Sequence, residues 1–546
     1  PVTFIASLVF IRLSVIRKTD SGLAPGSSFG VETAGSVAAG VVTAMTVTLH
    51  IPNYELYLLI LLLAAVISVT LLGYNVRAER TAMILLIPLA LLIITINPDL
   101  TARSLLLRDV TTVKSTDTPF GNITTAIYGG EQTVFYDHRP LFFSSDVVSR
   151  EENIHYALLQ REEYEKVMLI AGGLRKHLPE LEKYNIGELV YLEHDPGIIA
   201  AEGISDTVAG GMKVTVISND PITELRDSEE EYDAVLQLIP PPSTLAVTRF
   251  YTVEYFQLVK EHLSDKGIFL CTPMPYYNYS PESYRRSFSP LYNALDEAFN
   301  HIALIPGSAL YAVASDRPVT TTIAHLSGIR SLTNSYVNSD YLDDGEIRRR
   351  SEQIVLQVDR EAGMNSTLRP VSSLFANILS LERMGNSGEM IILLVISILI
   401  PFLFTRRGGL MMFTSSAALA GFGMIMIFIL QITAGNIYIL SAIILTLLMA
   451  GLAAGAARGH LLALKKLSVC TLILAVIYLV TGLLSPALVT ATPRTVIIVI
   501  FLSLPAAGFV TGAVYRILTS AGARGTTGSV YASDLAGAAL GYLTVA

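Results

Sequence analysis

The sequence predicts a polytopic α-helical membrane protein with an inserted α/β Rossmann-like soluble domain, which is preceded by a small β-subdomain. Hydrophobic residues make up 51% of the 546 residues, and the mean hydropathy of +0.52 is far above that of an average soluble protein. The apolar residues gather in long blocks at both ends of the chain, whereas residues 98–385 alternate short apolar strands with charged segments. Long uncharged blocks indicate helices that cross a membrane, and strands alternating with helices indicate a parallel sheet.

About ten runs have roughly the length needed to cross the hydrocarbon core of a bilayer. They lie at 2–16, 30–50, 54–74, 82–97, 388–404, 410–431, 436–456, 467–485, 495–515 and 529–546. Within them, the pairs Gly451 and Gly455, Gly508 and Gly512, and Gly537 and Gly541 have the spacing of closely packed helices. Residue 1 is proline and the outermost runs stop at the chain ends, so we expect helices to be missing at both ends.

These observations divide the chain into five predicted parts. They are 1–97, about four transmembrane helices; 98–165, a small β-subdomain and linker; 166–318, the Rossmann-like domain; 319–386, a helical connector; and 387–546, about six transmembrane helices.

Charge differs sharply between the soluble and apolar parts. Residues 98–385 carry 25 Lys plus Arg against 40 Asp plus Glu, whereas the remaining residues carry 13 against 6. In the apolar parts the basic residues fall in alternate connections between the runs, and only Arg494 lies on the other side. Because short basic loops face the cytoplasm, we expect residues 98–385 to lie on the extracytoplasmic side of an inner or plasma membrane.

Two apolar segments near the chain ends share a pattern. FGVETAGSVAAG, from Phe29, and YASDLAGAALGY, from Tyr531, align Glu32 with Asp534. Eight spans separate the two, which predicts an internal repeat with parallel halves related by an axis along the membrane normal. Two interpretations of the carboxylates stay open. They mark a cation or proton path, or they lie in the first turn of a helix and interact favourably with its dipole.

The soluble insert opens with short strands and continues with buried strands and helices. TPFGNITTAIYGGEQTVFYDHRPLFFS, from Thr118, contains a Gly-Gly pair that predicts a tight turn. The buried strand KVMLIAGG, from Lys166, ends at two glycines, and VYLEHDP, from Val190, supplies an acid about twenty residues later. VTVISNDP, from Val214, and the strand that begins YD at Tyr232 follow. This succession predicts a Rossmann-like parallel sheet.

Between Pro119 and Ser315 these segments resemble, in order, the membrane-fused spermidine synthase-like proteins, which are aminopropyltransferase-like. The helix ENIHYALLQ, from Glu152, and the segments RFYTVEYFQLVKEHLSDKGIFL, from Arg249, and PGSALYAVAS, from Pro306, complete the pattern. NSTLRPV, from Asn365, resembles the segment that this family places before the membrane is re-entered. The resemblance implies a Rossmann-like domain that uses decarboxylated S-adenosylmethionine to make a polyamine.

The resemblance also implies where a nucleoside would bind. Gly172 and Gly173 correspond to the loop that lets the backbone approach the ligand, and Glu193 to the acid that holds the ribose hydroxyls. Asp195 follows it, and Asp220 corresponds to the acid near the adenine. The residues alone equally fit strand-end acids that face solvent or cap the next helix. The only ligand that the resemblance suggests is a nucleoside of the S-adenosylmethionine type.

The acids that the family uses for anchoring and proton transfer are replaced in this chain. Leu174, followed by Arg175 and Lys176, stands where the family has an aspartate that meets the aminopropyl ammonium. Leu238 and Pro241 stand at the two acids that take the proton of the attacking amine and hold its tail. Neither side chain can accept a proton. No catalytic residue and no metal site are therefore predicted.

The preferred function is that of a pseudoenzyme, in which the soluble domain is a non-catalytic binding or assembly subunit. The expected partners are the lipid bilayer and other protein subunits that face the acidic domain, and no nucleic acid. Two alternatives stay open. One is a membrane-bound aminopropyltransferase of the spermidine synthase type that uses decarboxylated S-adenosylmethionine. The other is a transporter with parallel repeats and a sensor domain.

Overall fold

The computed structural model describes residues 25–48, 54–58, 98–107, 110–277, 281–383, 407–434, 438–458, 466–520 and 526–545, except for 119, 138, 144 and 145, with a few isolated positions besides. The chain forms two compact units, Pro1–Leu49 with Leu381–Ala546 and His50–Ser380. Each unit is described by itself. The predicted runs at 2–16, 54–74, 82–97 and 388–404 lie wholly or largely outside the described residues.

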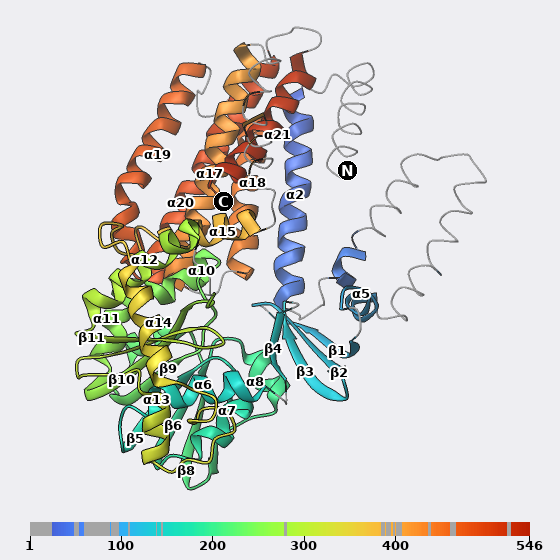
Figure 1. The fold of residues 1–546 in the computed structure, drawn as a ribbon. Coiled ribbons are helices and arrows are strands. Elements are labelled where there is room, and N and C mark those ends of the chain that lie inside the picture. Colours follow the sequence, from blue (N-terminus) through green and yellow to red (C-terminus); the bar gives the residue numbers. More distant parts are fainter. Residues whose placement is uncertain are drawn as a thin grey trace. The chain divides into compact units, whose positions relative to one another are not determined.

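The second unit begins with a four-stranded antiparallel meander (Figure 1). Its strands, in spatial order, are β1 (Thr111–Asp117), β2 (Asn122–Tyr128), β3 (Glu131–Tyr136) and β4 (Arg139–Phe143). Gly129 and Gly130 form the two-residue connection from β2 to β3, with φ of 59° and 87°. A tight hairpin needs these left-handed angles, which glycine adopts without steric cost. The predicted strands and Gly-Gly turn are therefore confirmed.

A larger sheet of eight strands follows (Figure 1). Its strands are β5 (Tyr164–Ile170), β6 (Ile186–Glu193), β7 (Thr207–Ala209), β8 (Met212–Ser218), β9 (Tyr232–Gln237), β10 (Leu263–Met274), β11 (His301–Pro306) and β12 (Leu310–Ser315). The spatial order is β11-β12-β10-β9-β5-β6-β8-β7. The five central strands pair in parallel, and β7, β11 and β12 add antiparallel edges. This is the predicted Rossmann-like arrangement.

Helices surround this sheet and continue beyond it. They are α5 (Pro98–Leu106), α6 (Val147–Leu158), α7 (Leu174–Leu181), α8 (Pro196–Glu202), α9 (Pro221–Asp227), α10 (Leu245–Thr248), the short 3-10 helix η1 (Arg249–Tyr251), α11 (Val253–Glu261), α12 (Glu282–Ala298), α13 (Ile323–Ile329), α14 (Asp344–Leu356) and α15 (Val371–Arg383).

The sheet is covered on both faces because its strand residues alternate between two cores. Met168 and Ile170 of β5 join the core that contains residues of α9, α11 and α12. Val167 and Leu169 join the other core, with residues of α6, α7 and α14. Successive side chains of a strand point to opposite faces, so the continuous apolar run of β5 is what a sheet buried on both faces requires.

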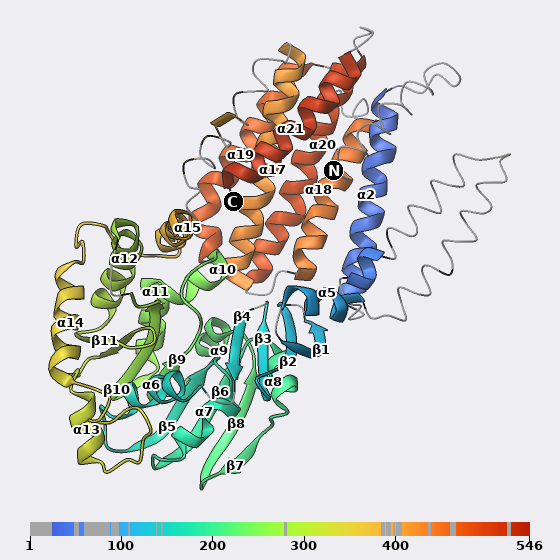
Figure 2. The same ribbon diagram turned by 45° about the vertical axis from the view of Figure 1, so that its right-hand side comes forward.

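The first unit is a bundle of helices (Figure 2). Its helices are α2 (Pro25–Thr48), α17 (Arg407–Ala434), α18 (Tyr438–Arg458), α19 (Leu467–Val489), α20 (Pro493–Ser520) and α21 (Thr526–Val545). Among the residues that the structure describes, four stretches are long and apolar enough to cross a membrane: Gly408–Thr433, Leu440–Arg458, Leu467–Val489 and Pro493–Ser520. They match the predicted runs at 410–431, 436–456, 467–485 and 495–515.

Small residues bring the helices of this bundle close together. A Cβ added at Gly455 would lie 1.9 Å from the carbonyl oxygen of Phe509, and one at Gly512 would lie 2.3 Å from that of Leu452. Glycine therefore allows α18 and α20 to approach backbone to backbone, as its spacing predicts.

The two helices that carry the proposed repeat run in the same direction. α2 is antiparallel to α18, because Gly30 approaches Ala457 and Gly40 approaches Thr446. α21 is parallel to α17, since Gly537 meets Phe413 and Gly541 meets Ala417. α17 and α18 are consecutive antiparallel helices (Figure 2). Parallel halves require that α2 and α21 run in the same direction, as they do. The repeat itself stays a prediction.

Candidate functional site

The topology of the large sheet places its crevice between β5 and β9. These two parallel strands are neighbours, and the chain leaves β5 toward β6 on one side and adds β10 beyond β9 on the other. Ligands of open α/β sheets bind at such a switch point, outside the carboxyl ends of the strands. Gly172 and Gly173 follow β5, and Leu238 follows β9, so the predicted glycine loop and Leu238 meet at this crevice.

Leu238 fills the space beside the glycine loop. The residues from Ala171 to Gly173 all have positive φ, at 60°, 84° and 86°. A Cβ added at Gly172 would lie only 2.7 Å from Cβ and Cδ1 of Leu238. Glycine is therefore required at position 172, because a larger residue would clash with the Leu238 side chain.

Glu193 and Asp195 are buried and are hydrogen-bonded within the protein. The Glu193 carboxylate accepts from the Tyr191 hydroxyl at 2.9 Å and from the Asp195 amide at 3.3 Å. The Asp195 carboxylate caps α8 by accepting from the Gly197 amide at 2.8 Å, and it accepts from the Thr118 hydroxyl at 2.6 Å. Thr118 precedes β2, so Asp195 joins the small sheet to the large one. Both acids act as structural acceptors in this arrangement.

Asp220 is also held by protein groups. Its carboxylate caps α9 through the Thr223 amide at 3.2 Å and forms a buried ion pair with Arg249. Arg249 comes from η1, the start of the RFYT segment. The helix-capping interpretation that the sequence left open therefore describes Asp220 in this structure.

Glu202 binds the start of α7, and the sequence analysis did not identify it. Its carboxylate accepts from the backbone amides of Leu174, at 3.1 Å, and Arg175, at 3.2 Å, which are the first residues of α7. Helix N-termini attract anions because their amides lack helical partners. No local signal identifies Glu202, because it lies at the end of α8.

The basic turn of α7 is largely neutralised by its own neighbours. Lys176 Nζ lies 2.5 Å from the Asp146 carboxylate, so Lys176 presents no free charge to the crevice. His177 is buried and contacts the Gly173 carbonyl at 2.7 Å, and burial lowers its pKa to about 3. Arg175 is exposed. Of these residues, only Arg175 is left to repel a cationic ligand.

Burial raises the pKa of Glu193 to about 7, and the hydrogen bonds from Tyr191 and Asp195 offset this only in part. A raised folded-state pKa means that the folded protein holds this proton more tightly than the unfolded chain between about pH 4.5 and pH 7. Stability therefore falls as the pH rises through this window. Burial likewise raises the pKa of Glu202 to about 7.

Replacing Glu193 by glutamine tests this dependence. Between pH 5 and pH 8, the unfolding free energy of wild type should fall by up to about 3 kcal/mol more than that of Glu193→Gln, because the variant has no carboxylate to ionise. Thermal unfolding of the full chain at several pH values measures the change. Glu352→Gln, at an exposed position, should show no such difference. An equal response of the two variants would contradict a buried, protonatable Glu193.

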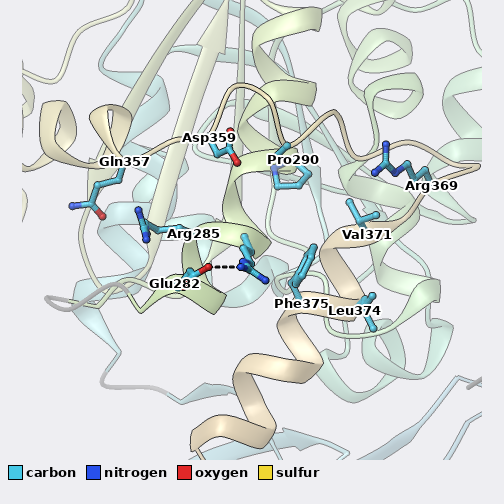
Figure 3. A pocket seen from close by; sticks show the side chains of 11 residues that line it. Glu282, Arg285, Pro290, Gln357, Asp359, Arg369, Val371, Leu374 and Phe375 are labelled. Atoms are coloured by element: carbon cyan, nitrogen blue, oxygen red, sulfur yellow. Dashed lines mark hydrogen bonds and ion pairs between the residues drawn. The ribbon is translucent and has the colours of Figure 1, made fainter.

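A separate cavity of about 480 Å³ lies between α12 and the segment 357–375 (Figure 3). Figure 3 shows Arg285 and Arg369 on opposite sides of Pro290, and the ion pair of Arg286 with Glu282. The residues that line it are Glu282, Arg285, Arg286, Pro290, Gln357, Asp359, Ala362, Arg369, Val371, Leu374 and Phe375. They include no His or Cys, whose side chains titrate nearest to neutral pH. This cavity offers charge and apolar surface for binding, and it contains none of the predicted site residues.

Comparison with known proteins agrees with this fold. Residues 148–292 match the family model of the spermine/spermidine synthase domain. Polyamine aminopropyltransferase 2 of Aquifex aeolicus is 26% identical over 161 residues, which are 28% of this chain and 33% of that protein. The polyamine aminopropyltransferase of Korarchaeum cryptofilum is 28% identical over 179 residues, 32% of this chain and 54% of that protein. This chain thus spans between a third and about half of the length of these relatives.

Among solved structures, the spermidine synthase from Thermotoga maritima aligns with 45% of this chain and 88% of its own, with a TM-score of 0.35 and 15% identity. The family match and the described strand order place the resemblance in the second unit. The chain therefore contains a spermidine synthase-like domain, joined in one sequence to four helices that are long and apolar enough to cross a membrane.

Proposed function

We propose that the spermidine synthase-like domain of this chain is non-catalytic and that it serves as a binding or assembly subunit of a membrane complex. The observation that carries the proposal is the contact between Leu238 and Gly172, because a hydrocarbon side chain occupies the space beside the glycine loop. Leu238 and Pro241 also stand where the family resemblance implies acids. A general base for amine attack has no candidate at these positions.

The hydrogen bonds of the remaining acids support the same proposal. Glu193, Asp195 and Asp220 each have protein partners, so ligand binding would have to compete with existing contacts. The charged and apolar cavity of Figure 3 fits a binding role, since its lining combines arginine and carboxylate side chains with apolar surface. The net negative charge of residues 98–385 suits a basic protein partner.

One of the two alternatives is a working aminopropyltransferase, which the names of the relatives favour. Both relatives described above are polyamine aminopropyltransferases. An assay of spermidine formation by the purified full chain separates the alternatives, because product would overturn the non-catalytic proposal.

We further propose that residues 98–385 lie outside the cytoplasm, as the alternating basic loops predict. A Leu356→Cys substitution tests the side, because Leu356 ends α14 with 84% of its surface exposed. The native Cys271 and Cys470 are both buried and should stay unlabelled. In intact cells, the variant should react with a membrane-impermeant thiol reagent. Labelling only after lysis would place the domain in the cytoplasm.

A further inference from the structure

A half-open cavity of about 200 Å³ lies among α2, α17, α18 and α21 of the bundle. Its polar lining includes Glu32 of α2, Asp534 of α21, Tyr531 and Ser416. Glu32 and Asp534 are the aligned residues of the proposed repeat, and they come from opposite ends of the sequence. The fold thus brings two carboxylates, of an exposed Glu32 and a half-buried Asp534, to one cavity of the apolar bundle.

The helix-dipole interpretation of these carboxylates is wrong. Neither α2 nor α21 has an acidic residue in its first turn. Glu32 lies about two turns into α2, which begins at Pro25, and Asp534 lies equally far into α21. The helix dipole acts mainly within the first turn. The dipole therefore does not account for two acids at this depth.

Each carboxylate has a hydroxyl donor, and the cavity supplies no positive charge. The Tyr531 hydroxyl donates to Glu32 Oε1 and the Ser416 hydroxyl to Asp534 Oδ1, both at 2.5 Å. No Lys, Arg or His is found among the described residues that line the cavity. Two acids without a counter-charge are costly in an apolar medium, so such groups generally mark a functional site.

An unpartnered hydroxyl is the second observation that points to a ligand. Tyr515 of α20 is fully buried, and its hydroxyl has no hydrogen-bond partner within the described part of the chain. The Tyr515 ring stacks on Phe29, which lines the cavity, with 4.0 Å between ring centroids. Tyr515 itself does not line the cavity, but its hydroxyl lies close enough to Asp534 and Glu32 to interact with both electrostatically. A buried hydroxyl without a partner destabilises the fold, and a ligand bound to its oxygen would offset this cost.

The lining indicates the charge and size of that ligand. Carboxylate and hydroxyl oxygens bind cations, and the rings of Phe29 and Tyr531 offer π-faces that attract an ammonium group. The volume of about 200 Å³ is ample for a small cation together with bound water. We propose that Glu32 and Asp534, together with Tyr531, Ser416 and Tyr515, form an intramembrane binding site for one small monovalent cation, either an alkali metal ion or a primary ammonium ion. This site is independent of the function proposed for the soluble domain.

Thermal unfolding of the full chain in detergent tests the site. Sodium chloride and methylammonium chloride are titrated at constant ionic strength against N-methyl-D-glucamine chloride, whose cation is much bulkier than either and serves as the reference. We expect one salt to raise the unfolding temperature saturably, as binding to the folded state requires. A rise with sodium identifies an alkali metal site, and a rise with methylammonium identifies an ammonium site. No saturable rise with either salt would overturn the proposal.

Single substitutions test whether the cation binds at Glu32 and Asp534. Glu32→Gln and Asp534→Asn should each weaken the apparent affinity at least tenfold, because each removes one of two anionic ligands. Glu55→Gln, outside the cavity lining, should leave the affinity unchanged. Equal affinity in Glu32→Gln and Glu55→Gln would contradict the assignment.

Tyr515→Phe keeps the proposal testable if the acidic variants fail to fold. It retains the stacked ring and removes only the unpartnered hydroxyl. We expect higher stability without the cation and several-fold weaker cation affinity. Higher stability with unchanged affinity would show that the hydroxyl does not face a ligand, and would contradict its place in the site.

Discussion

Spermidine is expected to stay undetectable when the purified full chain is incubated with putrescine and decarboxylated S-adenosylmethionine. Loss of a general base alone typically costs about 10² to 10⁴ in rate, and Leu238 and Pro241 stand where the family resemblance implies both acids of the loop. The family resemblance also implies an acid at position 174 that anchors the substrate ammonium. Leu174 stands there instead and is buried in the core. Arg175 adds repulsion, although the pairing of Lys176 with Asp146 removes a second source of it.

The measurement is chromatographic detection of product after long incubation at high protein concentration. The spermidine synthase from Thermotoga maritima, which is named for this activity, serves as the positive control under the same conditions. Calorimetric titration with the nucleoside substrate separates binding from turnover. Product that disappears in Glu193→Ala would show that the domain is an enzyme and that its site uses Glu193.

Gly455→Val is expected to destabilise the membrane bundle by about 3 kcal/mol or more, or to prevent its assembly. The new Cβ would lie 1.9 Å from the backbone carbonyl oxygen of Phe509, so α18 and α20 would have to separate. Rotamer changes cannot relieve this clash, because the obstructing atom belongs to the backbone. Gly512 is in the same seam, where a Cβ would lie 2.3 Å from the Leu452 oxygen.

Gly482→Val in α19 is the matched control. A Cβ at Gly482 meets nothing within 4 Å, so the same substitution should change stability by about 1 kcal/mol or less. Thermal unfolding and size-exclusion profiles of the two variants in detergent measure the difference. Similar losses in both variants would mean that glycine at 455 is not needed for close packing.

The fold could be read from the sequence because its signals are local. The glycine pair 129–130 needs only its own backbone freedom to turn β2 into β3, and the apolar run of β5 indicates burial on both faces. The strand-end positions of Glu193 and Asp220 follow from the same order of strands. Apolar length likewise predicts the four membrane-crossing stretches of the described helices.

The partners of the site residues could not be read in this way. That Leu238 fills the space beside Gly172, that Glu202 caps α7, and that Arg249 pairs with Asp220 depend on which segments the fold brings together. The same holds for Glu32 and Asp534, which the sequence aligned but could not bring to a common cavity. Sequence patterns determined the elements and their order, because periodicity and glycine act over a few residues. Tertiary structure alone decided which acids are already satisfied and which lack a counter-charge, because hydrogen bonds and burial link residues far apart in the chain.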